Sequence, residues 1–220
     1  MFISNTFEEF ELKIDKLPRG QNLLVQEFVT GEEIPVEALF YKGELLVYFS
    51  SNVLSYSTST FSYTTRKNYY NNVELRPILE RLGKELGLSG FANMLYFYNK
   101  EANKYYLIEV DPRPNSWMAY GRFIAHNDFT DGVKRIVNGD YINGYQGMQI
   151  KKPTVEIALF YKDFRRTIWK KDRKGTLRWI FNLNGYWRFI PFYDLKLSKK
   201  IFSNLWKEII VYKWNKIFSK

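Results

Sequence analysis

The fold of this chain is decided by the stretch Tyr105-Tyr-Leu-Ile-Glu-Val-Asp-Pro-Arg-Pro114. Its aromatic and branched residues are typical of a β-strand. Alternate residues of a strand share one face, so Glu109 and Asp111 are expected to point the same way. Pro112 and Pro114 then end the strand, because proline cannot donate a hydrogen bond to a neighbouring strand. The stretch therefore predicts a strand that presents two neighbouring carboxylates.

This pair of carboxylates suits a hard cation such as Mg²⁺, which takes oxygen ligands and usually keeps substrate phosphates and water in the rest of its shell. Arg113 lies between the two prolines, where a planar guanidinium can hold a phosphate or a carboxylate. The simpler alternative is an edge strand whose acids face solvent before a proline-ended turn. The motif taken alone favours this simpler alternative.

The heptapeptide from Ile108 to Pro114 resembles the metal-binding strand of ATP-grasp enzymes, which usually reads Glu-x-Asn-Pro-Arg. Here Asp111 stands in place of the Asn, which keeps an oxygen ligand and adds a negative charge. The resemblance implies that Glu109 and Asp111 bind Mg²⁺ and that Ile108 belongs to the nucleotide site. It also implies a catalytic role for Arg113.

A second stretch, Gln26-Glu-Phe-Val-Thr-Gly-Glu-Glu33, also resembles ATP-grasp proteins. In that family a strand ends in a hinge along the adenine edge, and an acid after a glycine turn reaches the ribose. Carried over to this sequence, the resemblance implies that Gln26 bonds the adenine amino group and that Glu33 bonds the ribose, because a carboxylate can accept hydrogen bonds from hydroxyls. The backbone of the hinge residues would face the base, and these residues are Glu27, Phe28 and Val29. On its own this stretch is an ordinary strand–turn–strand.

Length and composition are consistent with a globular protein of one or two domains. Aromatic residues make up 19% of the 220 residues, which favours strands over a helical bundle. The absence of cysteine excludes disulfides and thiolate chemistry and fits a cytoplasmic protein. The first residues do not resemble a signal peptide, and no apolar run is long enough to predict a transmembrane span.

The net charge of +10 is unevenly distributed. Residues 151–220 contain 18 Lys and Arg against 5 Asp and Glu, a net charge of +13, so the remainder of the chain carries −3. Together with the resemblance, this distribution implies two parts: an ATP-grasp-like subdomain over residues 1–140, and a basic appendage over residues 141–220 with a terminal amphipathic helix. A basic aromatic tail of this kind is also typical of proteins that bind an anionic membrane surface or nucleic acid.

The residue patterns of the first part predict an antiparallel sheet with flanking helices, an α+β fold. A short helix is expected from Asn5, and residues 50–72 are expected to form a long polar loop, with at most a ragged strand. The other predicted elements are strands at Leu23–Val29, Ile34–Phe40, Glu44–Ser50, Ser89–Tyr98 and Lys104–Asp111, a hairpin turn at Lys42-Gly43, and helices at Val73–Leu88 and Asp128–Asn138.

The appendage is predicted to be β-rich, with short strands separated by basic turns. These strands are expected at Val155–Tyr161, Thr167–Lys170, Thr176–Phe181 and Tyr186–Ile190. The helix predicted at Ser198–Lys220 either packs its apolar face on the body, which is the preferred interpretation, or lies on an anionic bilayer. Its lysines would then face water or headgroups: Lys199, Lys200, Lys207, Lys213 and Lys216.

The function that the resemblance implies is an ATP- and Mg²⁺-dependent ligation of a small carboxylate to an amine or a thiol through an acyl phosphate. Two departures bear on it. Leu95 stands where the family has a further metal-binding acid, and the sequence before Asn22 does not hold the family's phosphate-binding Lys or Gly-rich loop. An upstream segment or a separate chain would have to supply that half, so this chain alone is not expected to be a working ligase.

Three alternatives stay open at this point: a catalytically inactive remnant that serves as a binding module, a protein associated with anionic membranes, and a nucleic-acid-binding protein. Two further residues, Arg66 and His126, could take part in chemistry. Arg66 is a candidate anion ligand, although a solvated arginine is the preferred interpretation. His126, the only histidine, is expected in a surface turn without a chemical role.

Overall fold

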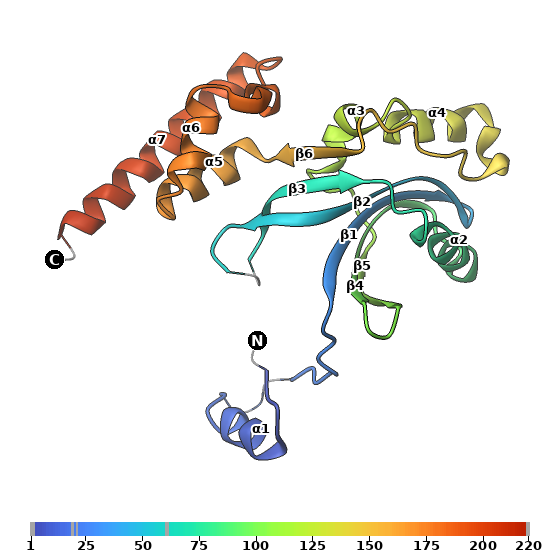
Figure 1. Cartoon of the computed structure of the whole chain (residues 1–220), viewed down its shortest axis with the longest axis horizontal. Coiled ribbons are helices and arrows are strands. Elements are labelled where there is room, and N and C mark those ends of the chain that lie inside the picture. The colour runs from blue at the N-terminus through green and yellow to red at the C-terminus, as the bar shows by residue number, and fades with distance from the viewer. Residues whose placement is uncertain (1–2, 19, 21, 60–61, 219–220) are drawn as a thin grey trace.

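The computed structural model describes residues 3–18, 20, 22–59 and 62–218, with side chains as far as Val211. Its centre is a six-stranded sheet in the order β5-β4-β1-β2-β3-β6, in which every neighbouring pair is antiparallel (Figure 1). The strands are β1 (Glu32–Tyr41), β2 (Glu44–Tyr56), β3 (Thr64–Tyr70), β4 (Gly90–Asn99), β5 (Lys104–Asp111) and β6 (Thr154–Ala158). The predicted α+β class is confirmed.

Helices cover both faces of this sheet, except α1, which lies apart from it (Figure 1). The helices are α1 (Phe7–Ile14), α2 (Leu75–Leu86), α3 (Gly121–Ile124), α4 (Phe129–Asn138), α5 (Phe160–Trp169), α6 (Arg173–Ile180) and α7 (Leu195–Phe218), with 3₁₀ turns η1 (Met118–Tyr120), η2 (Asp140–Asn143) and η3 (Leu183–Phe189). On one face α2 packs Leu75 and Leu79 onto the sheet. On the opposite face α3 and α4 pack Ile124 and Phe129 against Leu39. Figure 1 shows α5, α6 and α7 grouped at the opposite end of the molecule from α2.

Local signals explain most elements of the first part. Lys42 and Gly43 both have positive φ angles, 51° and 83°, as the two-residue turn of the β1–β2 hairpin requires. Gly87 ends α2 in the left-handed conformation at φ 59°. Asp128 caps α4 by accepting from the backbone N–H of Thr130. The predicted helices and strands between Ile34 and Asn138 are therefore confirmed, with shifts of a few residues at their ends.

Two predictions in this part are wrong. Residues 22–30 form no strand. The backbone of Leu23–Val29 has no neighbouring strand to pair with, and its apolar side chains are not buried, since Leu24 is 87% exposed. The polar stretch 50–72 is mostly strand, because β2 continues to Tyr56 and β3 begins at Thr64. Along β3 the residues Thr65, Lys67 and Tyr69 are buried in alternation, a period that the polar composition concealed.

The appendage is mainly helical, which corrects the β-rich prediction. Only the first of its four predicted strands exists, as β6, and it joins the main sheet beside β3. The stretches predicted as strands at Thr167–Lys170, Thr176–Phe181 and Tyr186–Ile190 lie largely in α5, α6 and η3. Their aromatic residues cluster on helix faces instead: Phe160, Trp179, Tyr186 and Phe189 are buried together. Asp172 also caps α6 by accepting from the N–H of Gly175.

The terminal helix α7 packs on this unit through Phe202, Leu205 and Ile209, with the Phe202 ring 5.2 Å from that of Phe160. The preferred interpretation, a packed apolar face, therefore describes this side of the helix. The side chains of Lys213 and Lys216 lie outside the described residues. None of the helices in the described part of the chain is long and apolar enough to cross a membrane.

A close approach between α2 and the β1–β2 hairpin gives a first test of the packing. A Cβ atom on Gly83 would lie 2.6 Å from the carbonyl oxygen of Gly43 and 2.8 Å from the Phe40 ring. Gly83→Ala should therefore lower the free energy of unfolding by about 1–3 kcal/mol, although the same change at an open helical site stabilises by about 1 kcal/mol. Urea unfolding measures the difference. The exposed neighbour Lys84→Ala is the control, expected within about 0.5 kcal/mol of wild type, and a stabilised Gly83→Ala protein would contradict the close approach.

Candidate functional site

A bulge in β5 sets the direction of the two carboxylates. Glu109 pairs with Leu95 and Leu107 with Tyr96, so Ile108 is an extra residue between them. Because of this extra residue, Tyr105 and Val110 both face the α2 side of the sheet, where they pack against the core. Glu109 and Asp111 therefore face the opposite side. Simple alternation from Tyr105 would have placed Glu109 on the α2 side.

On that side of the sheet lies a cavity of about 250 Å³. Of the four acids that line it, three were singled out in the sequence: Glu33 from β1, and Glu109 and Asp111 from β5. The remaining lining residues are Pro35, Val36, Glu37, Tyr63, Thr64, Lys67, Asn93, Met94, Leu95, Asn115, Trp117 and Lys162. The structure thus brings together three of the residues singled out in the sequence.

The three acids differ in their surroundings. Glu33 accepts a hydrogen bond from the hydroxyl of Tyr56. Burial, together with this bond to Glu33, raises the pKa of Tyr56 above its ordinary value, so the phenol stays a donor. Asp111 accepts from Nε of Arg113, at 2.9 Å and 2.7 Å to its two oxygens. Glu109 is exposed, and it has no hydrogen bond or ion pair among the described residues.

The floor of the cavity holds a buried ion pair that the sequence reading missed. Lys67 Nζ lies 2.7 Å from Oε1 of Glu37, and the side chain of Glu37 is only 2% exposed. The same ammonium group lies 4.8 Å from the centre of the Trp117 ring. Burial, and then the charge of Glu37, raises the pKa of Tyr69 well above its ordinary value. The alternation in residues 65–69 could have revealed Lys67, had that stretch been recognised as a strand.

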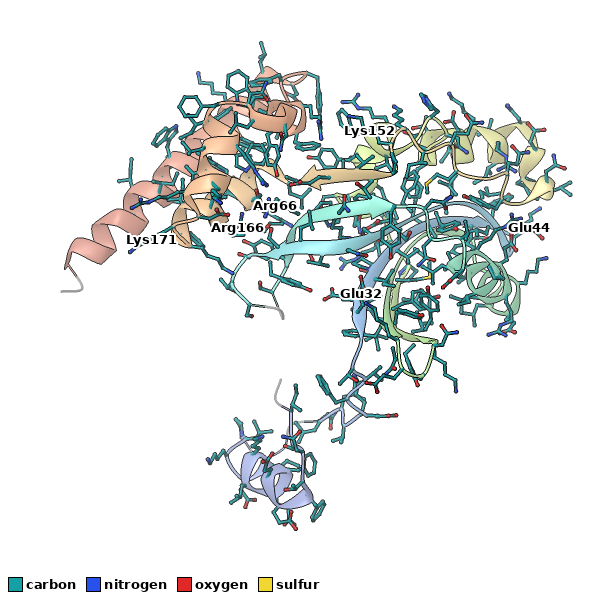
Figure 2. All side chains as sticks on the ribbon, in the orientation of Figure 1. Glu32, Glu44, Arg66, Lys152, Arg166 and Lys171 are labelled. Carbon is teal, nitrogen blue, oxygen red and sulfur yellow. The ribbon has the colours of Figure 1, made fainter. Side chains whose placement is uncertain are left out.

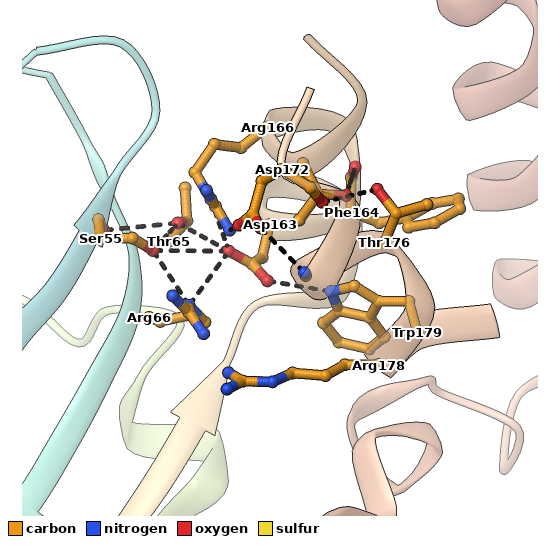
Figure 3. Close-up of polar contacts among 12 residues, drawn as sticks. Ser55, Thr65, Arg66, Asp163, Phe164, Arg166, Asp172, Thr176, Arg178 and Trp179 are labelled. Carbon is orange, nitrogen blue, oxygen red and sulfur yellow. Dashed lines mark hydrogen bonds and ion pairs between the residues drawn. The ribbon is translucent and has the colours of Figure 1, made fainter. Parts of the chain in front are cut away.

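Residues of the appendage complete one wall of the cavity. Lys162 at the start of α5 lines it, with Nζ 4.9 Å from the centre of the Tyr63 ring. The next residue, Asp163, is 1% exposed and fixes α5 to the sheet. Its Oδ1 accepts from Thr65 at 3.0 Å and from Nε of Arg166 at 2.9 Å, and its Oδ2 accepts from the Trp179 indole at 2.9 Å (Figure 3).

Arg66 belongs to this same network. It lies 3.6 Å from Asp163 and 3.3 Å from Glu156, and its side chain is largely buried. Figure 2 shows Arg66 close to Arg166, at the junction of the sheet with the helices. The preferred interpretation of Arg66 as a solvated arginine is therefore wrong, and its guanidinium is already taken by two carboxylates.

Six residues that the sequence singled out do not line the cavity. Gln26, Glu27 and Phe28 are exposed in the segment before β1, with Val29 half-buried beside them. Ile108 is exposed at the bulge, and Arg113 is turned to Asp111. Among the described residues, no backbone hydrogen bond involves positions 26–29. The single histidine, His126, is exposed.

The donor set of the cavity restricts how a metal could bind. No group of three or more His, Cys, Asp or Glu side chains in the described ranges could hold a metal ion. Glu109 and Asp111 can together offer carboxylate oxygens from one face of β5, and the other ligands of a Mg²⁺ ion would have to come from a bound phosphate and from water, as is usual for this ion. The residues present therefore fit a metal–nucleotide complex better than a metal alone.

Comparison with solved structures shows several likenesses of fold. The ATPase subunit of phosphoribosylaminoimidazole carboxylase from Aquifex aeolicus matches with a TM-score of 0.42 and 16% identity over 64% of this chain. N5-carboxyaminoimidazole synthetase from Staphylococcus aureus matches with a TM-score of 0.42 and 13% identity over 64% of this chain. The urea carboxylase of Kluyveromyces lactis matches with a TM-score of 0.44 and 14% identity over 58% of this chain.

The chain spans 47%, 38% and 12% of the three proteins, respectively. No protein-family model matches the sequence, and no curated protein matches it either. At these TM-scores and identities the likeness carries no argument about this chain, so any activity has to be argued from its own residues.

Proposed function

We propose that this chain provides the metal-binding side of an ATP-grasp-type nucleotide site, in a ligase that joins a small carboxylate to an amine or a thiol. The observation that carries the proposal is the convergence of Glu33, Glu109 and Asp111, from two separate strands, on one cavity. Glu109 and Asp111 would hold Mg²⁺ with the nucleotide phosphates, and Glu33 would accept from the ribose. The exposed segment from Gln26 to Val29 has unoccupied backbone groups that could bond the adenine.

The chemistry would proceed in two steps. An oxygen of the substrate carboxylate attacks the γ-phosphorus of ATP, the bond to the β-phosphate breaks, and ADP leaves. The amine or thiol then attacks the acyl carbon and loses its proton, and inorganic phosphate leaves. When bound, Mg²⁺ would supply charge stabilisation at the transferred phosphoryl group. Arg113 is now paired with Asp111. A bound phosphate would compete with Asp111 for this guanidinium, which would then stabilise the negative charge of the transferred group.

The site offers the nucleotide contacts from one side only. Its volume of about 250 Å³ lies below the 300 Å³ or so at which small-molecule pockets begin. Acids also outnumber the lysines that line it: Glu33, Glu37, Glu109 and Asp111 against Lys67 and Lys162. ATP without a cation would therefore be repelled, and binding of the metal complex by this chain alone should be weak, with a Kd of about 1 mM, or about −4 kcal/mol.

The test is a titration of the full chain with ATP in the presence of Mn²⁺, a stand-in for Mg²⁺ that prefers the same oxygen ligands. Enhanced relaxation of water protons reports the ternary complex even at millimolar Kd. We expect an enhancement that needs both ATP and Mn²⁺ and that Mg²⁺ competes away. A longer chain or a second polypeptide that closes over the phosphates should tighten the binding. Binding of ATP that survives EDTA would contradict the proposed role of the acids, and micromolar binding by this chain alone would contradict the one-sided site.

A second candidate function, a catalytically inactive binding module, is favoured by one observation. Leu95 lies opposite Glu109 in the β4–β5 pair and lines the cavity with an apolar side chain. Release of inorganic phosphate from ATP with candidate amino acids separates the two functions. Turnover that depends on a carboxylate and an amine supports the ligase, and metal-dependent binding with no turnover in the completed protein supports the binding module.

A further inference from the structure

The terminal helix α7 has a second face that the packing does not use. Its inward face meets the other helices through Phe202, Leu205 and Ile209, and Ser198 is anchored there by donating from Oγ to the carbonyl of Pro191 at 2.7 Å. With about 3.6 residues per turn, the residues on the opposite side of the helix from these positions must point outward. Figure 1 shows α7 running along the group formed by α5 and α6.

The outward side, called here the lysine face, consists of Lys196, Lys199, Lys200, Lys207, Trp206 and Ile210. All six side chains are exposed, and the two apolar ones are 60% and 59% exposed. None of the four lysines has an ion pair or a hydrogen bond with another described residue. Tyr193 and Leu195, just before the helix and at its start, continue the exposed apolar surface.

No acidic residue belongs to the lysine face, because the acids of α5, α6 and α7 bond to other side chains within this group of helices. Glu208 is the only acid in the sequence of α7, and it accepts from the Tyr161 hydroxyl and from Arg165 at 2.8 Å. The acids of the preceding helices, Asp163 and Asp172, are both bonded to Arg166. Arg165 and Arg166 are thus paired with acids of this unit, while the lysines of the lysine face are exposed to solvent.

We propose that the lysine face docks on an anionic phospholipid bilayer, with Trp206 and Ile210 entering the headgroup boundary. Amphipathic surfaces of this kind bind through apolar burial together with charge. Each lysine near an anionic bilayer contributes about a fivefold gain in partitioning, or about 1 kcal/mol. Nucleic acid would satisfy the same charge, but it would leave Ile210 and Leu195 in water, because its surface offers phosphates and stacking partners for aromatic rings only.

The experiment is sedimentation of the full chain with vesicles of phosphatidylcholine, with or without phosphatidylserine. We expect partitioning only onto the anionic vesicles, weakened by salt. The variant with Lys196→Gln, Lys199→Gln, Lys200→Gln and Lys207→Gln should lose at least about a hundredfold. A matched control removes the same charge from exposed lysines elsewhere, through Lys16→Gln, Lys84→Gln, Lys104→Gln and Lys152→Gln, and should lose far less.

A second variant separates a bilayer from nucleic acid. Trp206→Ser with Ile210→Ser keeps every charge, so it should lower vesicle partitioning by about tenfold or more. It should leave the binding of a double-stranded oligonucleotide unchanged, because a duplex offers phosphates but no free bases for Trp206 to stack on. Both residues are exposed, so the variant should unfold at the same temperature as wild type. Equal partitioning of the four-lysine variant and its control would overturn the proposal. So would vesicle binding that is indifferent to the loss of Trp206 and Ile210.

Discussion

Replacement of Glu109 by glutamine should abolish the metal-dependent binding of ATP by this chain. Glu109 is the one acid of the cavity that is exposed and free of any partner among the described residues, so its charge is available to a cation. An amide in its place keeps the size of the side chain and removes the negative charge that a hard cation requires. The Mn²⁺-dependent enhancement of water relaxation should therefore fall to the level of the nucleotide and metal without protein.

Two further variants make this test specific. Glu101→Gln removes an equal charge from the exposed turn between β4 and β5, and it should leave the enhancement as in wild type. Asp111→Asn keeps an oxygen ligand at that position, so it should retain most of the signal. If Glu109→Gln and Glu101→Gln give the same enhancement, Glu109 is not a metal ligand and the proposed site is wrong.

Replacement of Asp163 by alanine should destabilise the protein by about 3–5 kcal/mol, the usual cost of removing one partner from a buried ion pair. The change removes the acceptor of Arg166 Nε and of the Trp179 indole N–H, so that Arg166 keeps only its pair with Asp172. This loss is large beside the total of about 5–15 kcal/mol that holds a domain folded. Because Lys162 is the neighbouring residue, the wall of the cavity should also be lost.

Denaturant unfolding measures this effect, and two variants calibrate it. Asp163→Asn keeps an acceptor oxygen for Trp179 or Thr65 but loses the charge, and should fall between alanine and wild type. Glu85→Ala removes one partner of an exposed pair with Arg81 on α2, and should change the stability by less than about 1 kcal/mol. An Asp163→Ala protein as stable as the Glu85→Ala protein would show that the network contributes nothing to holding α5 on the sheet.

The parts of the fold that the sequence predicted correctly have local causes. Lys42-Gly43 specifies its own turn, and Pro112 stops β5 at Asp111, so the β1–β2 hairpin and the ends of β5 follow from neighbouring residues. The helix α4 is likewise marked at both ends, by Asp128 and Gly139.

The parts that were missed depend on contacts far apart in the chain. Thr65 and Lys67 looked like loop residues because their partners, Asp163 and Glu37, lie on distant elements. The bulge at Ile108 changes the direction of Glu109, yet no residue type in the sequence marks it. The helices of the appendage are rich in aromatic residues, which favour strands in isolation, and only burial of these residues against one another makes the helical arrangement favourable.

The position of β6 has a consequence for how the chain is made. Ala158 of β6 pairs with Arg66 of β3, and β6 is synthesised only after the other five strands and α4. During synthesis β3 therefore lacks its second neighbouring strand. Until β6 is made, β3 is an open edge, able to pair with another unfinished chain. Asp163 follows β6 by a few residues and covers the same edge through its contacts with Thr65 and Arg66 of β3. A chain stopped shortly before β6 would therefore retain most of the sheet while remaining prone to aggregate through β3.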